Sequence, residues 1–273
     1  MVILMIKLCT IDLDGTLFDK EKNISLANKE AIKEAQKNGC KIVIASGRPI
    51  HGVVPVLEKL DLFKSDDYVI CYNGAKVFNT KLGDTVYAST ISGKTVKELY
   101  KESKRLKLNF HAFRKNEELI TDVANPYTDV EVRINNIEFK IVDFNQIDDD
   151  EEFLKCMIVG EDSGITKAMQ ELNPRYYEEY CVVRSSSIFL EFLNKQTNKG
   201  SALKALAKHL KLDMSETMAI GDAGNELEMI KQAGIGVAMG NAFPEVKEYA
   251  NFITATNEES GVAVAINKFV NNK

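Results

Sequence analysis

Two carboxylates end the first apolar run of the chain. Asp12 and Asp14 follow the hydrophobic stretch of residues 2–11, and Gly15 comes directly after them. An apolar run that is bounded by a turn signal predicts a buried strand of an α/β sheet. Side chains two positions apart leave an extended chain on the same face, so both carboxylates are expected at the strand's carboxyl end, where open α/β sheets bind ligands. A strand end with solvated acidic residues is the alternative that this segment alone leaves open.

Three later segments add polar residues at the ends of predicted elements. They are Ser46-Gly47-Arg48 after a second apolar strand, Asn198-Lys199-Gly200 before a helix, and Gly221-Asp222-Ala223-Gly224-Asn225-Glu226 after a third strand. The carboxyl ends of parallel strands meet at one edge of a sheet. The four segments together therefore predict a single site.

With these segments in this order, the chain resembles the haloacid dehalogenase-like hydrolases, and within them the Cof-type branch with its YidA-like sugar phosphatases. The resemblance covers nearly the whole chain and extends through Tyr72-Asn73-Gly74-Ala75, Asn109-Phe110-His111-Ala112, Phe189-Leu190-Glu191-Phe192 and residues 218–270. It implies an α/β fold with a Rossmann-like, doubly wound parallel-sheet core, made of residues 1–84 and 191–273. An α+β cap domain, residues 85–190, is then inserted in this core.

The spacing of the segments supports this position for the cap. The interval from Asp12 to Ser46 has room for one helix, whereas the interval from Ser46 to Lys199 has room for a domain. The cap therefore enters after the second segment, as in the type IIB caps of Cof-like proteins. Within it we expect helices at 95–106 and 164–172, and strands at 109–113, 119–123, 153–159, 180–183 and 188–192.

Oxygen ligands and a phosphate substrate together predict a divalent ion. Four carboxylates would repel a phosphate monoester unless a cation intervenes, and oxygen-only ligands favour Mg²⁺. We expect the carboxylates of Asp12 and Asp222 to bind the metal directly, and the resemblance implies that Asp14 contributes its backbone carbonyl. Glu226 stands where the family pattern G-D-x-x-N-D ends in aspartate. We expect it to hold metal-bound waters, with a weakened or altered metal preference.

The same residues suggest a covalent mechanism. Asp12 is expected to attack phosphorus and form an aspartyl phosphate. Asp14 would protonate the leaving oxygen and then deprotonate the hydrolytic water. Lys199 would neutralise charge in the transition state, and because a lysine is mildly unfavourable at a helix start, a functional reason for it is favoured.

Contacts to the phosphate and to the rest of the substrate are expected from several polar groups near the strand ends. They are Leu13 through a backbone amide, Ser46, Gly47, Arg48, Asn73, Gly74 and Asn225. Asn-Gly at 73–74 is also a strong two-residue hairpin signal, which alone would explain this pair. In the cap, the candidates for substrate contacts are His111, Arg114, Arg184 and Ser186, each of which packing or surface exposure could equally explain.

Local signals set the bounds of the first helices. Ser25 is a predicted N-cap, and Gly39 ends the helix that follows it. A second helix follows Arg48, and because an interior proline costs about 3 kcal/mol, we expect this helix to start just before Pro55. The acidic run at 148–152 is expected to be a solvated loop and not a metal site.

Composition limits the partners and the compartment. Thirty-five basic and 40 acidic residues give a formal charge of −5, which argues against nucleic acid as a partner. The first residues lack a basic start and a cleavage site, and no stretch is long and apolar enough to predict a membrane span. We interpret residues 1–4 as a short extension before the first strand. Five dispersed cysteines indicate reduced thiols in the cytoplasm, without zinc or disulfides. We expect a monomer or homodimer with a small phosphorylated substrate.

The leading hypothesis is thus a Mg²⁺-dependent phosphatase that acts on small phosphorylated metabolites, sugar phosphates in particular. A phosphomannomutase-like phosphotransferase shares the predicted cap position and remains an alternative. A weakly catalytic phosphometabolite-binding protein, suggested by Glu226, is another. Asp14 argues against P-type ATPases, which have threonine two positions after the nucleophile, and against haloacid dehalogenases, which lack this second aspartate.

Overall fold

The computed structural model describes residues 5–64 and 66–272, which divide into two units. The core unit joins the chain up to Tyr87 with the chain from Asn198 onward, and the cap unit is Ala88–Thr197. The expected boundaries were 84/85 and 190/191. The second one falls later because strand β12 (Phe189–Asn194) pairs with cap strands on both sides. The predicted extension at residues 1–4 lies outside the described residues.

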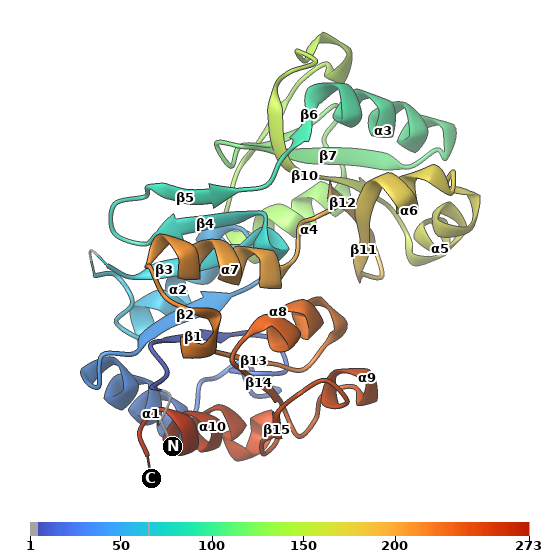
Figure 1. Cartoon of the computed structure of the whole chain (residues 1–273). Coiled ribbons are helices and arrows are strands. Elements are labelled where there is room, and N and C mark those ends of the chain that lie inside the picture. Colours follow the sequence, from blue (N-terminus) through green and yellow to red (C-terminus); the bar gives the residue numbers. More distant parts are fainter. Residues whose placement is uncertain (1–4, 65, 273) are drawn as a thin grey trace. The chain divides into compact units, whose positions relative to one another are not determined.

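An eight-stranded sheet forms the middle of the core unit, in the order β15-β14-β13-β1-β2-β3-β4-β5 (Figure 1). The strands from β15 to β3 are parallel, and β4 is antiparallel to β3. Because the chain winds outward from β1 in both directions, this is the predicted doubly wound α/β fold. The strands are β1 Leu8–Ile11, β2 Lys41–Ala45, β3 Tyr68–Cys71, β4 Lys76–Asn79, β5 Thr85–Ala88, β13 Thr217–Gly221, β14 Ile235–Ala238 and β15 Phe252–Ile253.

Helices cover both faces of this sheet (Figure 1). They are α1 Leu26–Lys37, α2 Ile50–Lys59, α7 Lys199–His209, α8 Leu227–Gln232, α9 Pro244–Lys247 and α10 Gly261–Phe269. Helix α7 buries Leu203 and Leu206 against Leu8 and Val43 of the sheet, while α1 and α10 pack together. The predicted cap of α1 is confirmed, because the Ser25 side chain accepts a hydrogen bond from the Asn28 amide at 3.2 Å.

The prediction for the second helix was wrong. Helix α2 begins at Ile50, so that Pro55 lies in its interior. A proline there removes one hydrogen bond to the carbonyl of His51, but that residue is exposed and water can solvate its carbonyl. Val53 and Leu57 are fully buried on either side of the proline. Their burial stabilises the helix enough to offset the lost hydrogen bond.

The cap unit contains a second sheet in the order β11-β12-β10-β7-β8-β9, and β6 pairs with β10. Its strands are β6 Ile91–Ser92, β7 Asn109–Arg114, β8 Leu119–Thr121, β9 Phe139–Ile141, β10 Glu152–Val159, β11 Tyr180–Ser186 and β12. Its helices are α3 Gly93–Arg105, α4 Pro126–Asn135, α5 Asp162–Glu171 and α6 Arg175–Glu179. The expected cap elements are present, whereas α4, α6, β6 and β9 were not predicted.

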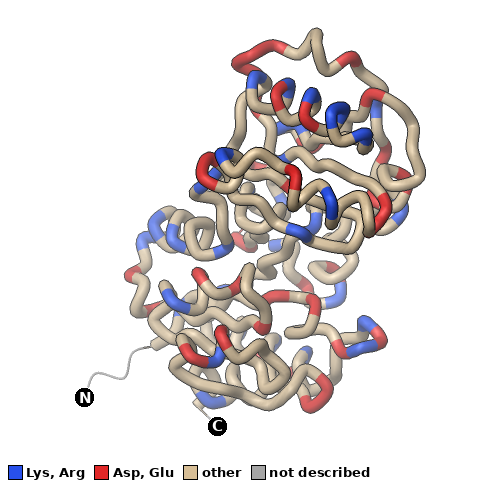
Figure 2. The backbone as a smooth tube through the Cα atoms, turned by 90° about the vertical axis from the view of Figure 1, so that its right-hand side faces the viewer, with Lys and Arg blue, Asp and Glu red and all other residues tan. Residues whose placement is uncertain are grey.

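Acidic and basic residues are interleaved along both units (Figure 2). No helix in the described part of the chain is both long enough and apolar enough to cross a bilayer. The acidic run at 148–152 makes ion pairs with cap residues, including Arg114 with Glu151 at 2.7 Å.

Candidate active site

The site begins where three neighbouring strands end. Ile11 of β1 is in register with Ile44 of β2 and with Ile220 of β13. The segments that follow these strands therefore emerge at one edge of the core sheet, as the sequence predicted. The amide of Asp12 donates to the carbonyl of Ile220 at 3.1 Å, which fixes the first carboxylate beside β13.

Lys199 lies at the centre of the acidic groups. Its side chain is fully buried, and its Nζ donates to Asp12 Oδ1 at 2.6 Å and to Glu226 Oε1 at 2.5 Å. Burial alone would lower the pKa of Lys199, but the two carboxylates reverse this and raise it. Asn198 caps α7 by accepting a hydrogen bond from the Ser201 amide at 2.8 Å. The N-cap contact of Asn198 and the two ion pairs hold the charged side chain of Lys199 at the start of α7, where the helix dipole disfavours a cation.

Glu226 is bound through both of its oxygens. Oε1 accepts from Lys199, and Oε2 accepts from the Ala223 amide at 2.9 Å. A Cβ atom at Gly221 would lie 2.4 Å from Glu226 Cγ, so the longer side chain fits only because residue 221 is glycine. The structure thus gives Glu226 a positioning contact with Lys199 that sequence reasoning did not predict. Its expected contact with metal-bound waters stays a prediction.

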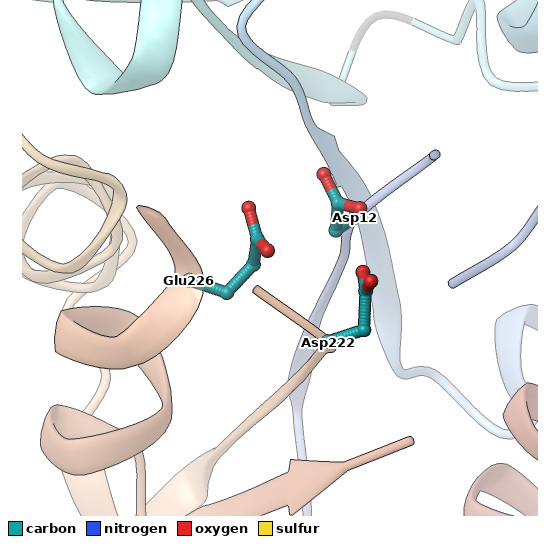
Figure 3. A group of neighbouring side chains, drawn as sticks. All are labelled: Asp12, Asp222 and Glu226. Atoms are coloured by element: carbon teal, nitrogen blue, oxygen red, sulfur yellow. The ribbon is translucent and has the colours of Figure 1, made fainter. Parts of the chain in front are cut away.

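Three carboxylates could hold a cation. Ligand oxygens of Asp12, Asp222 and Glu226 lie within 4.8 Å of one another, and Figure 3 shows the three side chains around one space. Burial raises the pKa of Asp12 to about 7 against the opposing charge of Lys199, and burial raises the pKa of Asp222 to about 6. Three carboxylates beside one ammonium leave an excess of two negative charges when all are ionised. A divalent ion with oxygen preference fits this donor set.

Asp222 is positioned by the first motif. Thr16 Oγ1 donates to Asp222 Oδ1 at 2.9 Å. Gly15 has φ +84°, and a Cβ atom there would lie 2.4 Å from Asp222 Oδ2. Glycine is therefore needed both for the backbone conformation and for the approach of the carboxylate. Sequence reasoning assigned no role to Thr16, although it stands inside the first motif.

Asp14 is bound by two basic side chains. Its side chain is half exposed and accepts from Lys22 Nζ at 2.5 Å and from Arg48 at 2.9 Å. Burial would raise the pKa of Asp14, but the hydrogen bond from Lys22 and the charge of Arg48 outweigh burial and lower it. Lys22 was not predicted as a site residue. Its contact depends on a turn with φ +62°, which an isolated lysine does not signal.

The turn after β3 connects the remaining motifs. The Asn73 amide donates to the Ser46 carbonyl at 3.1 Å, and the Asn225 side chain donates to Asn73 Oδ1 at 3.4 Å. Ser46 is buried and its hydroxyl accepts from the Arg48 amide at 3.2 Å. A Cβ atom at Gly47 would lie 2.9 Å from Asn73 Oδ1. The structure thus brings Ser46, Gly47 and Asn225 together around Asn73, whereas their binding of phosphate stays a prediction.

The prediction of a two-residue hairpin turn at 73–74 was wrong. Cys71 pairs with Lys76, so four residues connect β3 and β4. Tyr72 and Asn73 have φ values of +54° and +53°, and Gly74 has +97°. The extra residues bring the chain against the start of α7, which explains why a short hairpin turn does not form here.

The Leu13 amide donates a hydrogen bond to the Asp12 carboxylate and so opposes the rise in the pKa of Asp12.

In the cap, each of the four candidate contact residues has a partner within that unit. His111 lies fully buried between Thr128 Oγ1 and Met157 Sδ, each 3.0 Å away. The other three pair as Arg114 with Glu118 and Glu151, Arg184 with Asp162 and Thr166, and Ser186 with the Ile188 amide.

Replacing Gly74 by alanine is expected to lower the free energy of unfolding by about 3 kcal/mol or more. A Cβ atom at this position would lie 2.3 Å from the Asn198 carbonyl oxygen, which is backbone and cannot move aside cheaply. Gly83→Ala is the matched control, because Gly83 has φ +74° with nothing within 4 Å of its Cβ position. We expect the control to lose only about 1 kcal/mol. Urea titrations of both variants measure the difference, and equal losses would contradict the close approach at Gly74.

Comparison with known proteins identifies the family. The family model described as haloacid dehalogenase-like hydrolase matches residues 9–266. The chain is a haloacid dehalogenase-like hydrolase. This confirms both the predicted family and the predicted fold class.

Individual relatives match over almost the full length of this hydrolase. The Bacillus subtilis (strain 168) protein YxeH is 37% identical over 269 residues, which cover 97% of this chain and 99% of YxeH. A crystal structure of a haloacid dehalogenase-like hydrolase from Bacteroides thetaiotaomicron superposes with a TM-score of 0.84 at 34% identity, covering 96% of this chain and 99% of that one. The subclass IIB sugar phosphatase BT4131 has a TM-score of 0.77 at 25% identity, covering 96% and 98% of the two chains.

Proposed function

We propose that this hydrolase is a Mg²⁺-dependent cytoplasmic phosphatase that cleaves small phosphorylated metabolites, with sugar phosphates as the substrate class. One observation carries the proposal: the buried ammonium of Lys199 bridges Asp12 and Glu226 next to a third carboxylate, Asp222. The similarity to a structure described as a sugar phosphatase supports the substrate class. Five free thiols suit a reducing compartment.

The carboxylates of Asp12 and Asp222, with the backbone carbonyl of Asp14, would hold the metal ion. Bound there, the ion would supply positive charge that lets an acidic site accept a phosphate dianion. Glu226 keeps its contacts to Lys199 and Ala223, and so acts on the ion through the groups that it positions.

The proposed hydrolysis assigns a role to each residue that would surround the phosphorus atom of the substrate. An oxygen of Asp12 forms a bond to phosphorus while the bond to the ester oxygen breaks. The protonated form of Asp14, which its contacts with Lys22 and Arg48 disfavour in the free protein, gives its proton to the departing alkoxide. Asp14 next takes a proton from water, whose oxygen attacks the aspartyl phosphate and releases inorganic phosphate. Ser46 and the Gly47 amide hydrogen-bond the phosphoryl oxygens throughout.

Phosphate release from a panel of phosphorylated metabolites with Mg²⁺ tests this function directly. Hexose, pentose and glycerol phosphates are compared with pyridoxal phosphate and flavin mononucleotide, and a chelator is added in a parallel series. We expect release from sugar phosphates that is lost with the chelator. Interconversion of sugar phosphate isomers without phosphate release would instead favour a mutase, and tight binding without turnover would favour a binding protein.

Metal binding is expected to be coupled to proton release. Asp12 and Asp222 have pKa values raised to about 7 and about 6, and a ligating carboxylate must be ionised. Between about pH 7 and pH 6 one proton competes with the ion, so the affinity for Mg²⁺ should fall about tenfold for each pH unit. Below about pH 6 two protons compete, and the affinity should fall about a hundredfold for each pH unit. Calorimetric titrations with MgCl₂ in two buffers of different ionisation enthalpy measure the number of protons. An affinity that stays constant from pH 5 to pH 8 would contradict this coupling.

A further inference from the structure

Two asparagines in the C-terminal part of the core unit bind the loop that follows β1. Asn241 Nδ2 donates to the carbonyl of Gly15 at 2.8 Å, and Asn257 Nδ2 donates to the carbonyl of Phe18 at 2.9 Å. The bonded residues are 226 and 239 positions apart in the chain, so neither contact arises from local structure. The two side chains therefore hold a short loop segment at both of its ends.

A second contact decides the orientation of the Asn241 amide group. The backbone amide of Asn257 donates to Asn241 Oδ1 at 2.9 Å. Because a backbone N–H can only donate, the side-chain oxygen of Asn241 must face Asn257, and its NH₂ group must face the Gly15 carbonyl. Asparagine supplies the acceptor and the donor that these two contacts need. The two residues thus act as one unit, which we call the asparagine clamp (Asn241 and Asn257).

The clamp is itself fixed to the backbone of the core unit. Gly240 directly precedes it, and the Gly240 amide donates to the Ala255 carbonyl at 3.0 Å. A Cβ atom at Gly240 would lie 2.8 Å from the Thr256 nitrogen, so glycine allows the two segments to approach closely. On the other side, the Phe243 amide donates to the Asp222 carbonyl at 3.0 Å. The clamp therefore stands on the segment that follows β13.

The loop that the clamp holds carries the carboxylate of Asp14. Asp14 directly precedes Gly15, and the Phe18 amide folds the loop back by donating to the Leu13 carbonyl at 2.9 Å. The ion pairs of the Asp14 side chain involve long side chains with solvent exposure, and such pairs restrain a position weakly. The backbone bonds of the clamp are therefore the firmer restraint on where this carboxylate starts from.

We infer that Asn241 and Asn257 are positioning residues for Asp14, the proposed general acid. They hold the Gly15 and Phe18 carbonyls, and so fix the backbone from which the Asp14 carboxyl reaches the leaving oxygen. A misplacement of about 1 Å costs about a hundredfold in rate. The inference rests on the proposed phosphatase function, because it concerns the proton that Asp14 transfers in that reaction.

Two aryl phosphates distinguish this role from general support of the site. Phenolate is a much stronger base than p-nitrophenolate, so phenyl phosphate needs a proton on its leaving oxygen far more than p-nitrophenyl phosphate does. The value of kcat/KM covers the steps up to the departure of the alcohol and leaves out the later hydrolysis of the aspartyl phosphate. A misplaced Asp14 should therefore lower kcat/KM for phenyl phosphate and spare kcat/KM for p-nitrophenyl phosphate.

The test compares Asn241→Ala and Asn257→Ala with Asn251→Ala. Asn251 is the matched control, since its exposed side chain also bonds to the backbone of the core unit, accepting from the Gly236 amide at 2.7 Å. We expect the ratio of kcat/KM for phenyl phosphate to kcat/KM for p-nitrophenyl phosphate to fall at least about tenfold in both clamp variants and to stay unchanged in the control. Equal losses for the two esters, or no loss, would overturn the inference. Asn241 is exposed and Asn257 half-buried, so both variants should fold, and either one decides alone.

Hydrogen exchange tests the clamp separately from the function. A wild-type protein that cleaves neither ester would contradict the proposed function. Peptides that span residues 13–20 should still exchange at least about threefold faster in Asn241→Ala and Asn257→Ala than in the wild type, because the loop loses a hydrogen bond and opens more often. Asn251→Ala should exchange at the wild-type rate in this region. Unchanged exchange in both clamp variants would overturn the inference, with or without turnover.

Discussion

Replacing Asp12 by asparagine should reduce the turnover of p-nitrophenyl phosphate by a factor on the order of 10⁴ or more. An amide cannot form the acyl phosphate, and it cannot supply the charge that the metal ion and Lys199 both need. The variant should still fold, because the amide keeps the shape of the carboxylate and can accept the Lys199 hydrogen bond. Phosphate release in the presence of Mg²⁺ measures the loss, with circular dichroism as the control for folding.

Detection of the covalent intermediate distinguishes a nucleophilic role of Asp12 from a purely structural one. Mass spectrometry of acid-quenched wild-type enzyme should show a phosphorylated fraction during turnover, and the Asp12→Asn variant should show none. Glu226→Gln is the matched comparison, because it removes the other carboxylate that Lys199 binds. We expect a smaller loss, on the order of 10²-fold, since Glu226 acts by positioning. Equal abolition by both substitutions would contradict the view that only Asp12 reacts and binds the metal directly.

The central residues of this site were predictable because strand order and register decide where they lie. Asp12 and Asp222 each follow a buried parallel strand, and the pairing of β1 with β13 brings such strand ends together regardless of the loops that follow. Lys199 was predictable for a different reason. A lysine at a helix start opposes the helix dipole, so its presence there required a partner that the structure supplies as two carboxylates.

Contacts that depend on turn conformation were not predictable. Lys22 reaches Asp14 only because its own backbone adopts φ +62°, and neither residue type signals this. The four-residue turn at 72–75 is similar, since Asn-Gly favours a shorter turn locally. The close approach of Gly74 to Asn198 depends on a residue far along the chain, and long-range packing overrides the local preference.

Helix α4 escaped prediction because periodicity methods assume an apolar core. Its inward residues are Thr128, Glu131 and Asn135, so the sequence shows no apolar stripe at helical spacing. The N-cap was readable, since Asn125 accepts hydrogen bonds from two amides of the first turn and Pro126 follows it. A helix that packs against buried charges can be recognised by its N-cap residue but not by the spacing of its apolar residues.

Replacing Lys199 by methionine is expected to lower the free energy of unfolding at pH 7 by about 3–5 kcal/mol, because removing one partner leaves buried charge without compensation. Asp12 and Glu226 would then face each other without a cation. The pKa of Asp12, which burial already raises in the wild type, should rise further in the folded variant, so stability should fall as pH rises between about 4 and the raised pKa.

The metal ion supplies the decisive comparison for this variant. Mg²⁺ bound at Asp12 and Asp222 would replace part of the missing positive charge, so the stability of Lys199→Met should increase with MgCl₂ concentration more steeply than that of the wild type. Lys155→Met is the matched control. It also removes a buried ammonium from a carboxylate, that of Glu191, but this pair lies in the cap unit. Urea titrations at several MgCl₂ concentrations measure both variants. Only a cation that is bound among Asp12, Asp222 and Glu226 can substitute for the ammonium lost in Lys199→Met. The assignment of the metal site beside Lys199 would therefore be wrong if Mg²⁺ stabilised both variants equally, or if it stabilised neither of them.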